Sequence, residues 1–390
     1  MESQYIATCP REVQSLVASE IRSNGGVNVS EGFKSVYFDA DDTNVYRMHS
    51  ALRSASRIFL VVKKGSGSSL PIISNQSSKA KWDQFFLPNS TFLVEGVVGD
   101  RGPSAPSGTE VSKAVRQGLE SYFLKKGLKK PSVDLKSPKI KIVAFVHNKR
   151  LTISIDTSGK AFHKRGYKVS SHPAPLKETL AASMLQLSGY TGSEPLYDPM
   201  SGSGTIPIEA CYMALDKAPL IHRKKGEFAL ENLASFDYQL WRRVQDELRQ
   251  SRRPSLDHPI HAHDISEAFI DGARQNAVKA RVEKDIQFRV ADFIGSIPPS
   301  EPGIIVTNLP YGERIQASRT EFDQSIKEFY KEFGNTLKRN YSGWRAAVLV
   351  SADSPYKFIG LRPSRKIPLM NGSIECKLLL FEMYQGSRKN

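Results

Sequence analysis

The sequence is short of cysteine and of acidic side chains, and it has no long apolar run. Its three cysteines, Cys9, Cys211 and Cys376, lie far apart and form neither a Cys-x-x-Cys pair nor a pattern typical of disulfide-rich secreted domains. The sequence contains no run of about 18 apolar residues, the length that a helix needs to span a bilayer. The first residues also lack the basic-then-apolar order of a signal peptide. We therefore expect a reduced, cytoplasmic protein.

The shortage of acidic residues is concentrated in one segment. The 390 residues carry 55 Lys and Arg against 40 Asp and Glu, a net charge of +15. Residues 113–168 alone hold 15 basic and 3 acidic side chains, whereas residues 1–112 hold 11 of each and residues 171–390 hold 29 against 26. Such a local excess favours a polyanionic partner such as nucleic acid, although a solvated basic helix would give the same count.

The first half mixes short apolar strands with amphipathic helices, which predicts a small α+β unit that binds RNA. The low-complexity stretch KKGSGSS at 63–69 predicts a flexible connection. Strands are expected at 36–38, 58–62 and 91–98, a helix at 111–124, and a hairpin from 140–145 to 151–155.

From about residue 174 the pattern changes to alternating strands and helices, which predicts an α/β domain with a parallel sheet. Asn371-Gly372 before the final strand predicts an antiparallel hairpin at one edge of that sheet. The expected strands are 195–200, 260–265, 286–291, 304–308, 346–351 and 375–384, and the expected helices are 176–187, 205–215, 266–280 and 321–337.

A glycine-rich turn, Asp198-Pro-Met-Ser-Gly-Ser-Gly-Thr205, joins the first of these strands to a helix. Such a turn lets the backbone approach a ligand at the carboxyl edge of the sheet. It is not a phosphate-binding Walker loop because no Gly-Lys-Ser/Thr follows, and Pro207 stands where a dinucleotide fingerprint has its third glycine. Alone, the turn is weak evidence for a cofactor.

Two further strand ends strengthen that evidence. Asp264 follows the next strand and can accept both hydroxyls of a ribose, and Asp292 with Phe293 ends the strand after it, where an acceptor and a ring can recognise adenine. A nucleoside pocket without a basic cluster for a pyrophosphate favours S-adenosylmethionine over NAD.

The turn Thr307-Asn308-Leu309-Pro310-Tyr311-Gly312-Glu313-Arg314 follows the fourth strand. The Asn308 side-chain oxygen and a carbonyl of Leu309 or Pro310 can accept the two N–H groups of an exocyclic base amine. That arrangement would place the amine nitrogen for attack on a methyl sulfonium. Tyr311 can stack on a flipped or single-stranded base.

Together these motifs resemble the THUMP-containing RNA guanine-N2 methyltransferases, most closely the bacterial 23S rRNA enzymes. The resemblance extends over nearly the whole chain. It is carried by residues 82–86, 156–159, 163–167, 174–182, 198–205 and 308–314. It implies a ferredoxin-like and THUMP region at 1–165, with the THUMP module at about 50–157. It also implies a class I (Rossmann-like) methyltransferase domain at 166–390 with a seven-stranded, mostly parallel sheet.

The resemblance also implies which residues bind each partner. Pro175, Lys177 and Glu178 would lie beside the methionine end of S-adenosylmethionine, above Asp198 and the glycines. The other expected cofactor residues are Met200, Ser201, Gly202, Ser203, Gly204, Thr205, Asp264, Ile265, Asp292, Phe293 and Asn308. The expected catalytic residues are Asn308, Leu309, Pro310 and Tyr311, and the expected RNA-binding residues are Lys125, Lys126, Lys129, Lys130, Lys164 and Arg165.

Several alternatives stay open. Leu309 replaces the proline usual in the rRNA enzymes, and Asn-Leu-Pro-Tyr also resembles tRNA guanine-N2 enzymes. An RNA-binding or ribosome assembly factor without activity is a further alternative. Adenine-N6 methylation of DNA has less support because no helix-turn-helix is evident. We expect an unfused, monomeric enzyme acting on 23S rRNA or a pre-50S particle. We expect no metal, since His258, His261 and His263 suggest no fourth ligand.

Overall fold

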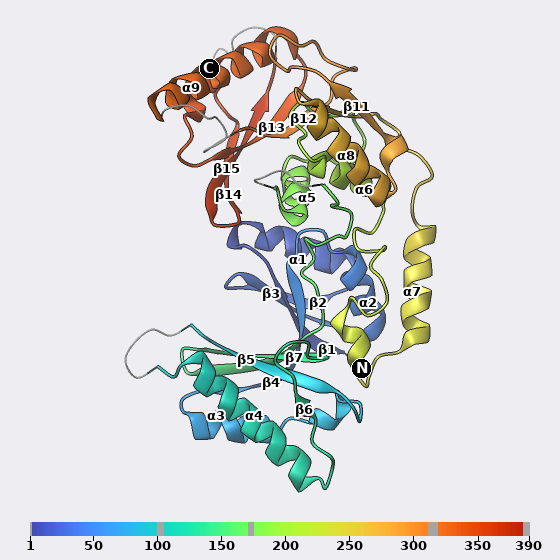
Figure 1. Ribbon diagram of the computed structural model, residues 1–390, viewed down its shortest axis with the longest axis vertical. Helices are drawn as coiled ribbons and strands as arrows, with labels where there is room; N and C mark the ends of the chain where they lie inside the picture. Colours follow the sequence, from blue (N-terminus) through green and yellow to red (C-terminus); the bar gives the residue numbers. More distant parts are fainter. Residues whose placement is uncertain (1, 100–104, 171–174, 311–318, 385–390) are drawn as a thin grey trace.

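The computed structural model describes residues 2–99, 105–170, 175–310 and 319–384, and at 319–323 only the backbone. Figure 1 shows an elongated molecule with one β-sheet at each end. The helix α7 (Tyr238–Gln250) runs along one side of it. No helix in these ranges is both long and apolar enough to cross a membrane.

The amino-terminal half is built on a sheet whose described strands follow the order β2-β3-β1-β4-β8-β7-β5-β6. Its helices are α1 (Gln14–Ser23), α2 (Asp42–Ala51), α3 (Leu70–Ser78) and α4 (Gly108–Lys125). The strands are β1 (Ser3–Thr8), β2 (Val27–Gly32), β3 (Ser35–Ala40), β4 (Arg57–Ser66), β5 (Thr91–Val98), β6 (Ser132–Val133), β7 (Ile140–His147) and β8 (Arg150–Asp156).

The expected flexible connection at 63–69 is wrong, because β4 continues to Ser66 and α3 begins at Leu70. Residues Lys63 to Ser66 pair in register with β8. The Lys64 ammonium also lies 4.8 Å from the centre of the Tyr37 ring. Backbone pairing with a neighbouring strand has here overridden the low strand propensity of Lys, Gly and Ser.

Helix α4 is held in place at its start and along its buried face. It carries Lys113 and Lys125 of the basic segment, and Lys126, Lys129 and Lys130 follow it. Ser107 Oγ accepts the Glu110 N–H, and Glu110 accepts the Ser107 N–H, which forms a capping box. Its buried face packs on α3 at Gly118, where an added Cβ would lie 2.2 Å from the Ser74 carbonyl oxygen. The helix therefore ends at a fixed place, and Lys125 marks that end.

The carboxyl-terminal half contains the expected mostly parallel α/β sheet, in the order β11-β10-β9-β12-β13-β15-β14. Among its described strands only β15 pairs antiparallel, with β13 and with β14, which confirms the edge hairpin. The strands are β9 (Leu196–Asp198), β10 (Ile260–Asp264), β11 (Ile286–Val290), β12 (Ile304–Asn308), β13 (Arg345–Ser351), β14 (Arg365–Asn371) and β15 (Ile374–Glu382). The helices are α5 (Glu178–Leu187), α6 (Thr205–Ala214), α8 (Glu267–Ala280) and α9 (Arg319–Asn340).

The segment between α6 and β10 joins the two halves. Its helix α7 packs on α2 of the amino-terminal half. Glu247 pairs with Arg47 at 2.6 Å, and Gln245 accepts the Ser50 hydroxyl at 2.9 Å. The insertion therefore fixes the catalytic domain against the amino-terminal half.

Candidate active site

The carboxyl ends of β9, β10 and β12 form the candidate site. Strand β9 lies between β10 and β12, so the chain changes direction across the sheet at β9. In open α/β sheets, ligands bind in the crevice beyond the strand ends at such a point. The structure therefore brings the glycine-rich turn, Asp264 and Asn308 to one edge.

The glycine-rich turn adopts a conformation that requires glycine at two positions. Gly202 and Gly204 have φ values of 51° and 76°, in the left-handed region. A Cβ on Gly204 would also lie 2.9 Å from the Ala273 Cβ of α8. The turn is fixed to the end of β10, because the Ser201 N–H donates to the His263 carbonyl at 2.9 Å.

Asp264 holds the same turn with its side chain. One carboxylate oxygen accepts the Gly202 N–H at 2.9 Å, and the other accepts the Ser266 N–H at 3.0 Å. Ser266 in turn is the N-cap of α8, where its side chain accepts the Phe269 N–H. Each oxygen keeps a second lone pair. Ribose recognition by Asp264 therefore stays a prediction that this geometry allows.

Asp198 is the most deeply buried carboxyl group at this edge, with 1% of its surface exposed. Its Oδ1 accepts the Met200 N–H at 3.3 Å. Burial raises the pKa of Asp198 to about 7, and the nearby charge of Asp264 acts in the same direction. A positively charged ligand beside Asp198 would favour its ionised form.

Buried oxygen atoms near the ends of the adjacent strands β9 and β12 lack a hydrogen-bond partner among the described residues. They include the Ser201 hydroxyl oxygen and Asn308 Oδ1. Leaving a buried polar atom unpaired costs about 1–3 kcal/mol, so a ligand that bonds to these atoms would recover that free energy. The hydrogen-bond acceptors at this edge fit a cofactor with hydroxyl and amine groups, which donate.

The turn after β12 is described only as far as Pro310. Leu309 is fully buried, and its N–H donates to the Leu349 carbonyl at 3.1 Å. The Pro310 carbonyl accepts the Tyr330 hydroxyl at 3.3 Å and keeps a second lone pair. Tyr311 lies outside the described residues, so its stacking role stays a prediction.

Asn276 of α8 was missed by motif reasoning. Asn276 is fully buried and makes four hydrogen bonds of 2.8 to 3.0 Å. Its Oδ1 accepts the Val169 and Ser170 N–H groups. Its Nδ2 donates to the Ser170 and Ser203 carbonyls. It thus ties the segment before α5 to the glycine-rich turn. An asparagine inside a helix, where it is disfavoured, was the available signal.

The segment before α5 contains the residues expected at the methionine end. Glu178 begins α5, is 4% exposed, and pairs with Lys168 at 3.5 Å. Lys168 also donates to the Leu176 carbonyl at 2.5 Å. Burial raises the pKa of Glu178, whereas Pro175 and Lys177 are exposed.

The residues expected around the adenine differ in how far they are exposed at this edge. Asp292 is exposed and accepts the Ile294 N–H at 2.9 Å, and Ile265 is 71% exposed. Phe293 is only 2% exposed, with its ring centre 4.9 Å from that of Phe333. Phe293 therefore lies in the core below this edge, and Asp292 and Ile265 are the better placed of the three to contact a base.

The lysines expected to bind RNA are exposed, but Arg165 is not. The Arg165 side chain is 0% exposed and pairs with Glu209 at 3.3 Å. It also donates to the Phe162 and Arg53 carbonyls. The expectation that Arg165 binds RNA is therefore wrong, because its charge is used inside the protein. The exposed residues are Lys125, Lys126, Lys129, Lys130 and Lys164.

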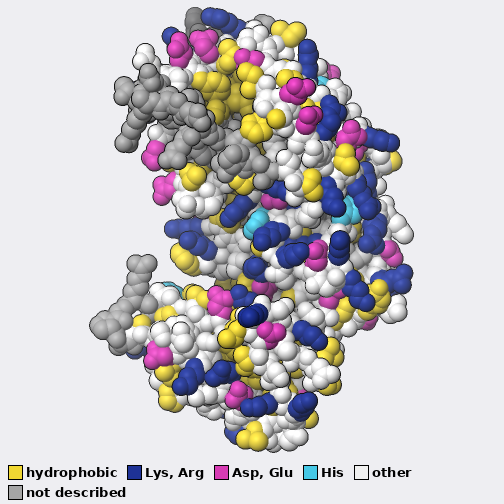
Figure 2. Space-filling model, viewed as in Figure 1, with side chains coloured by type: hydrophobic (Ala, Val, Ile, Leu, Met, Phe, Trp, Pro, Cys, Tyr) yellow, Lys and Arg dark blue, Asp and Glu magenta, His cyan; other side chains and the backbone are white. Residues whose placement is uncertain are grey.

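Basic side chains are not confined to the segment that carries the sequence excess. Figure 2 shows Lys and Arg, in dark blue, at the end of the molecule formed by α3 and α4, and also across the middle of the same face. Within residues 113–168, Lys160 pairs with Glu227 of the catalytic half. Part of the local excess thus joins the two halves.

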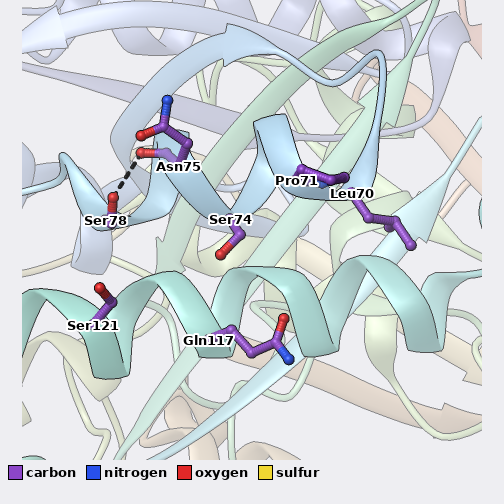
Figure 3. Close-up of a pocket in the computed structure, with 7 residues that line it drawn as sticks. All are labelled: Leu70, Pro71, Ser74, Asn75, Ser78, Gln117 and Ser121. Carbon is purple, nitrogen blue, oxygen red and sulfur yellow. Dashed lines mark hydrogen bonds between the residues drawn. The ribbon is translucent and has the colours of Figure 1, made fainter.

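An open groove of about 430 Å³ lies far from the sheet edge, between α3 and α4. Figure 3 shows hydroxyl and amide side chains along it, with the Ser78 hydroxyl donating to the Asn75 carbonyl. None of the residues that line it is ionisable, so it offers no acid or base. The lining residues are Leu70, Pro71, Ser74, Asn75, Ser78, Gln117 and Ser121.

The histidines of β10 pack against an aromatic ring. The His263 ring centre lies 4.9 Å from that of Tyr197, and burial lowers the pKa of His263 to about 4. Within the described ranges, no group of three or more His, Cys, Asp or Glu side chains is placed to hold a metal ion.

Comparison with known proteins supplies matches for each part of the chain. The family described as "RMKL-like, methyltransferase domain" matches residues 165–379. The "RlmL ferredoxin-like domain" matches residues 4–59, and the "THUMP domain" matches residues 67–156.

Individual relatives match over the whole chain. A Synechocystis sp. protein assigned as an RNA methyltransferase is 30% identical over 380 residues, 97% of each chain. The ribosomal RNA large subunit methyltransferase K/L of Shewanella frigidimarina is 32% identical over 391 residues, 99% of this chain and 53% of that one. The chain thus spans about half the length of this K/L relative. The solved structure of SMU.472, assigned as a methyltransferase and complexed with SAH, shares the fold at 22% identity, with a TM-score of 0.87 over 99% of each chain.

Proposed function

This chain belongs to the RMKL-like methyltransferase family, and on that basis we propose that it methylates the exocyclic N2 amine of a guanine in RNA of the large ribosomal subunit. Its cofactor is S-adenosylmethionine, as the sequence predicts and as its family of methyltransferases indicates. The cofactor supplies a methyl group bound to a positively charged sulfur. A nucleophile can attack this methyl carbon in line with the carbon–sulfur bond, which breaks as the new bond forms.

The residues at the sheet edge fit such a cofactor. The Ser201 hydroxyl and the carboxyl groups of Asp198 and Asp264 lie at the ends of neighbouring strands. Carboxylates suit the ribose hydroxyls and the positive charges of the methionine part. Asn276 would keep the glycine-rich turn and the segment before α5 in one arrangement around it.

The observation that carries the proposed chemistry is the buried Asn308 Oδ1, which has no hydrogen-bond partner in the described part of the chain. The lone pair of a guanine N2 amine is delocalised into the ring, which makes the nitrogen a poor nucleophile. Asn308 Oδ1 and the Pro310 carbonyl would accept its two N–H groups and orient the nitrogen toward the methyl group. The proton leaves after methylation, and no covalent intermediate with the protein forms.

RNA is the substrate class that the amino-terminal half favours. A THUMP match covers the sheet region that carries α3 and α4, and Lys125, Lys126, Lys129 and Lys130 extend from the end of α4 into solvent. Exposed lysines bind phosphates without reading sequence. The substrate named for the K/L relatives makes large-subunit rRNA the first candidate and tRNA the second.

Mass spectrometry of nucleosides from a deletion strain tests this proposal. We expect N2-methylguanosine to be lost from one fragment of large-subunit rRNA and to return when the intact gene, but not the Asn308→Ala gene, is supplied. Loss from tRNA instead would assign the tRNA alternative. An unchanged nucleoside content in both RNAs would exclude the proposed reaction and favour a factor without activity.

A further inference from the structure

The turn between β13 and β14 lies at the same sheet edge as Asn308. Asn308 of β12 is in register with Leu349 of β13, and Leu349 with Leu378 of β15. Strand β13 ends two residues later, at Ser351, and a short helical turn (Tyr356–Ile359) follows. Because neighbouring strands lie about 4.8 Å apart, β15 is roughly 10 Å from the strand that carries Asn308.

Two lysines from the edge hairpin converge on this turn. The ammonium groups of Lys366, in β14, and Lys377, in β15, lie 5.5 and 5.0 Å from the centre of the Tyr356 ring. Lys377 also donates to the Ala352 carbonyl at 3.3 Å. The two positive charges are therefore at most roughly 10 Å apart, within about one Debye length, and they repel each other.

Neither lysine has a carboxylate partner within ion-pair distance among the described residues. An exposed aromatic side chain lies in the same short helical turn as Tyr356. Phe358 is 49% exposed, and Lys327 of α9 lies 5.8 Å from its ring centre. The surface thus combines unpaired positive charge with an exposed ring. These four residues, Lys327, Phe358, Lys366 and Lys377, are called the hairpin surface below.

We propose that the hairpin surface binds the RNA strand next to the target nucleotide, with phosphates at Lys366 and Lys377 and a flanking base on Phe358. The inference rests on the proposed RNA substrate. Basic side chains interleaved with exposed aromatic rings are the usual means of binding single-stranded RNA, since phosphates take the charge and any base can stack. Enzymes that extrude a base also derive substrate preference from contacts to the flanking nucleotides.

A purely structural role explains these contacts less well. One lysine over Tyr356 would fix the ring, whereas a second one adds repulsion and little further packing. An anion between the two ammonium groups removes that repulsion. Because this turn lies at the same sheet edge as Asn308, roughly two strand spacings away, the phosphates of the substrate strand are the nearest source of such an anion.

The test compares two pairs of charge-removing substitutions in the full chain. Lys366→Gln with Lys377→Gln removes the hairpin charges. Lys279→Gln with Lys284→Gln removes two exposed charges near the start of β11, at the opposite edge of the same sheet. The readouts are KM for an rRNA fragment at several salt concentrations, the dissociation constant for S-adenosylmethionine, and the thermal midpoint.

We expect the hairpin pair to raise KM for RNA about tenfold at moderate salt. The slope of log affinity against log salt should fall by roughly 1.4, or about 0.7 for each phosphate that the protein no longer neutralises. The control pair should change neither value. Cofactor affinity and the thermal midpoint should stay unchanged in both, and Lys366→Arg with Lys377→Arg should restore RNA binding.

Phe358→Ala tests the stacked base separately. We expect KM for RNA to rise about tenfold with the salt slope unchanged, because a stacked base contributes affinity without charge. RNA binding by the hairpin pair equal to that of the control pair would overturn the inference. So would competition by poly-glutamate as effective as that by RNA, which would indicate an acidic protein partner. If the unmodified chain methylates no RNA, the proposed function fails instead.

Discussion

Charged side chains differ between the two halves of this molecule in where they lie and what they contact. At the end of α4, Lys125 and Lys129 are exposed and have no carboxylate within ion-pair distance among the described residues. In the catalytic half, Arg165, Glu209 and Asp198 are almost completely buried. Solvated charge can be offered to RNA, whereas buried charge must be neutralised within the fold. Charged side chains therefore control affinity for RNA in one half and stability in the other.

Among the substitutions that test this difference between the halves, Arg165→Ala should have the largest effect, on the free energy of unfolding. It leaves the Glu209 carboxylate buried without its partner, and we expect a loss of about 3–5 kcal/mol in the free energy of unfolding. Guanidinium denaturation at pH 7 measures this loss. The salt dependence of RNA binding should stay unchanged. If Arg165→Ala kept full stability but reduced the salt dependence of RNA binding, Arg165 would have to contact RNA instead.

The buried carboxyl group of Asp198 should make stability depend on pH. Its pKa is about 7 in the fold against 3.8 when exposed, so between these values the folded state binds the extra proton. The contribution of Asp198 to stability should therefore be greatest below about pH 4 and fall by up to about 4 kcal/mol as pH rises to 7. Denaturation between pH 4 and pH 7 measures this loss of stability, which should be absent in Asp198→Asn. Identical pH profiles for the two proteins would contradict it.

Asn308→Ala should separate chemistry from RNA binding. We expect kcat to fall by about 10²- to 10³-fold, roughly 3–4 kcal/mol, since one positioned acceptor of the amine is lost. Affinity for RNA, measured by filter binding, should change little because the lysines of α4 are untouched. Asn335→Ala on α9, where Asn335 bonds only to Glu332 in the described contacts, serves as the control. Full methyl transfer by Asn308→Ala would remove Asn308 from the mechanism.

The smallest effect is expected from the solvated lysines. Lys125→Glu with Lys129→Glu should weaken RNA binding by about 10- to 30-fold and lower the salt slope by roughly 1.5, with cofactor affinity and thermal midpoint unchanged. Lys279→Glu with Lys284→Glu is the matched control. Equal losses in both pairs would mean that net charge alone, rather than the end of α4, attracts RNA.

The local sequence pattern was enough to predict most strands and helices of the catalytic half. The strand expected at 304–308 has the observed bounds, and the helix expected at 266–280 begins at Glu267. Periodicity works there because buried parallel strands and amphipathic helices differ in their spacing of apolar residues. It failed at 63–69, where the edge of β8 supplies hydrogen bonds that no local propensity reveals.

The sequence was enough to identify the kinds of groups at the site: a glycine-rich turn, two carboxylates and the Asn308 turn, each directly after a strand. Their common edge followed from the rule that parallel strands end together. Burial, however, depends on what packs on a side chain from distant parts of the chain. Tertiary structure alone turned Arg165 inward to Glu209, placed Asn276 between two loops, and brought Lys366 and Lys377 together over Tyr356.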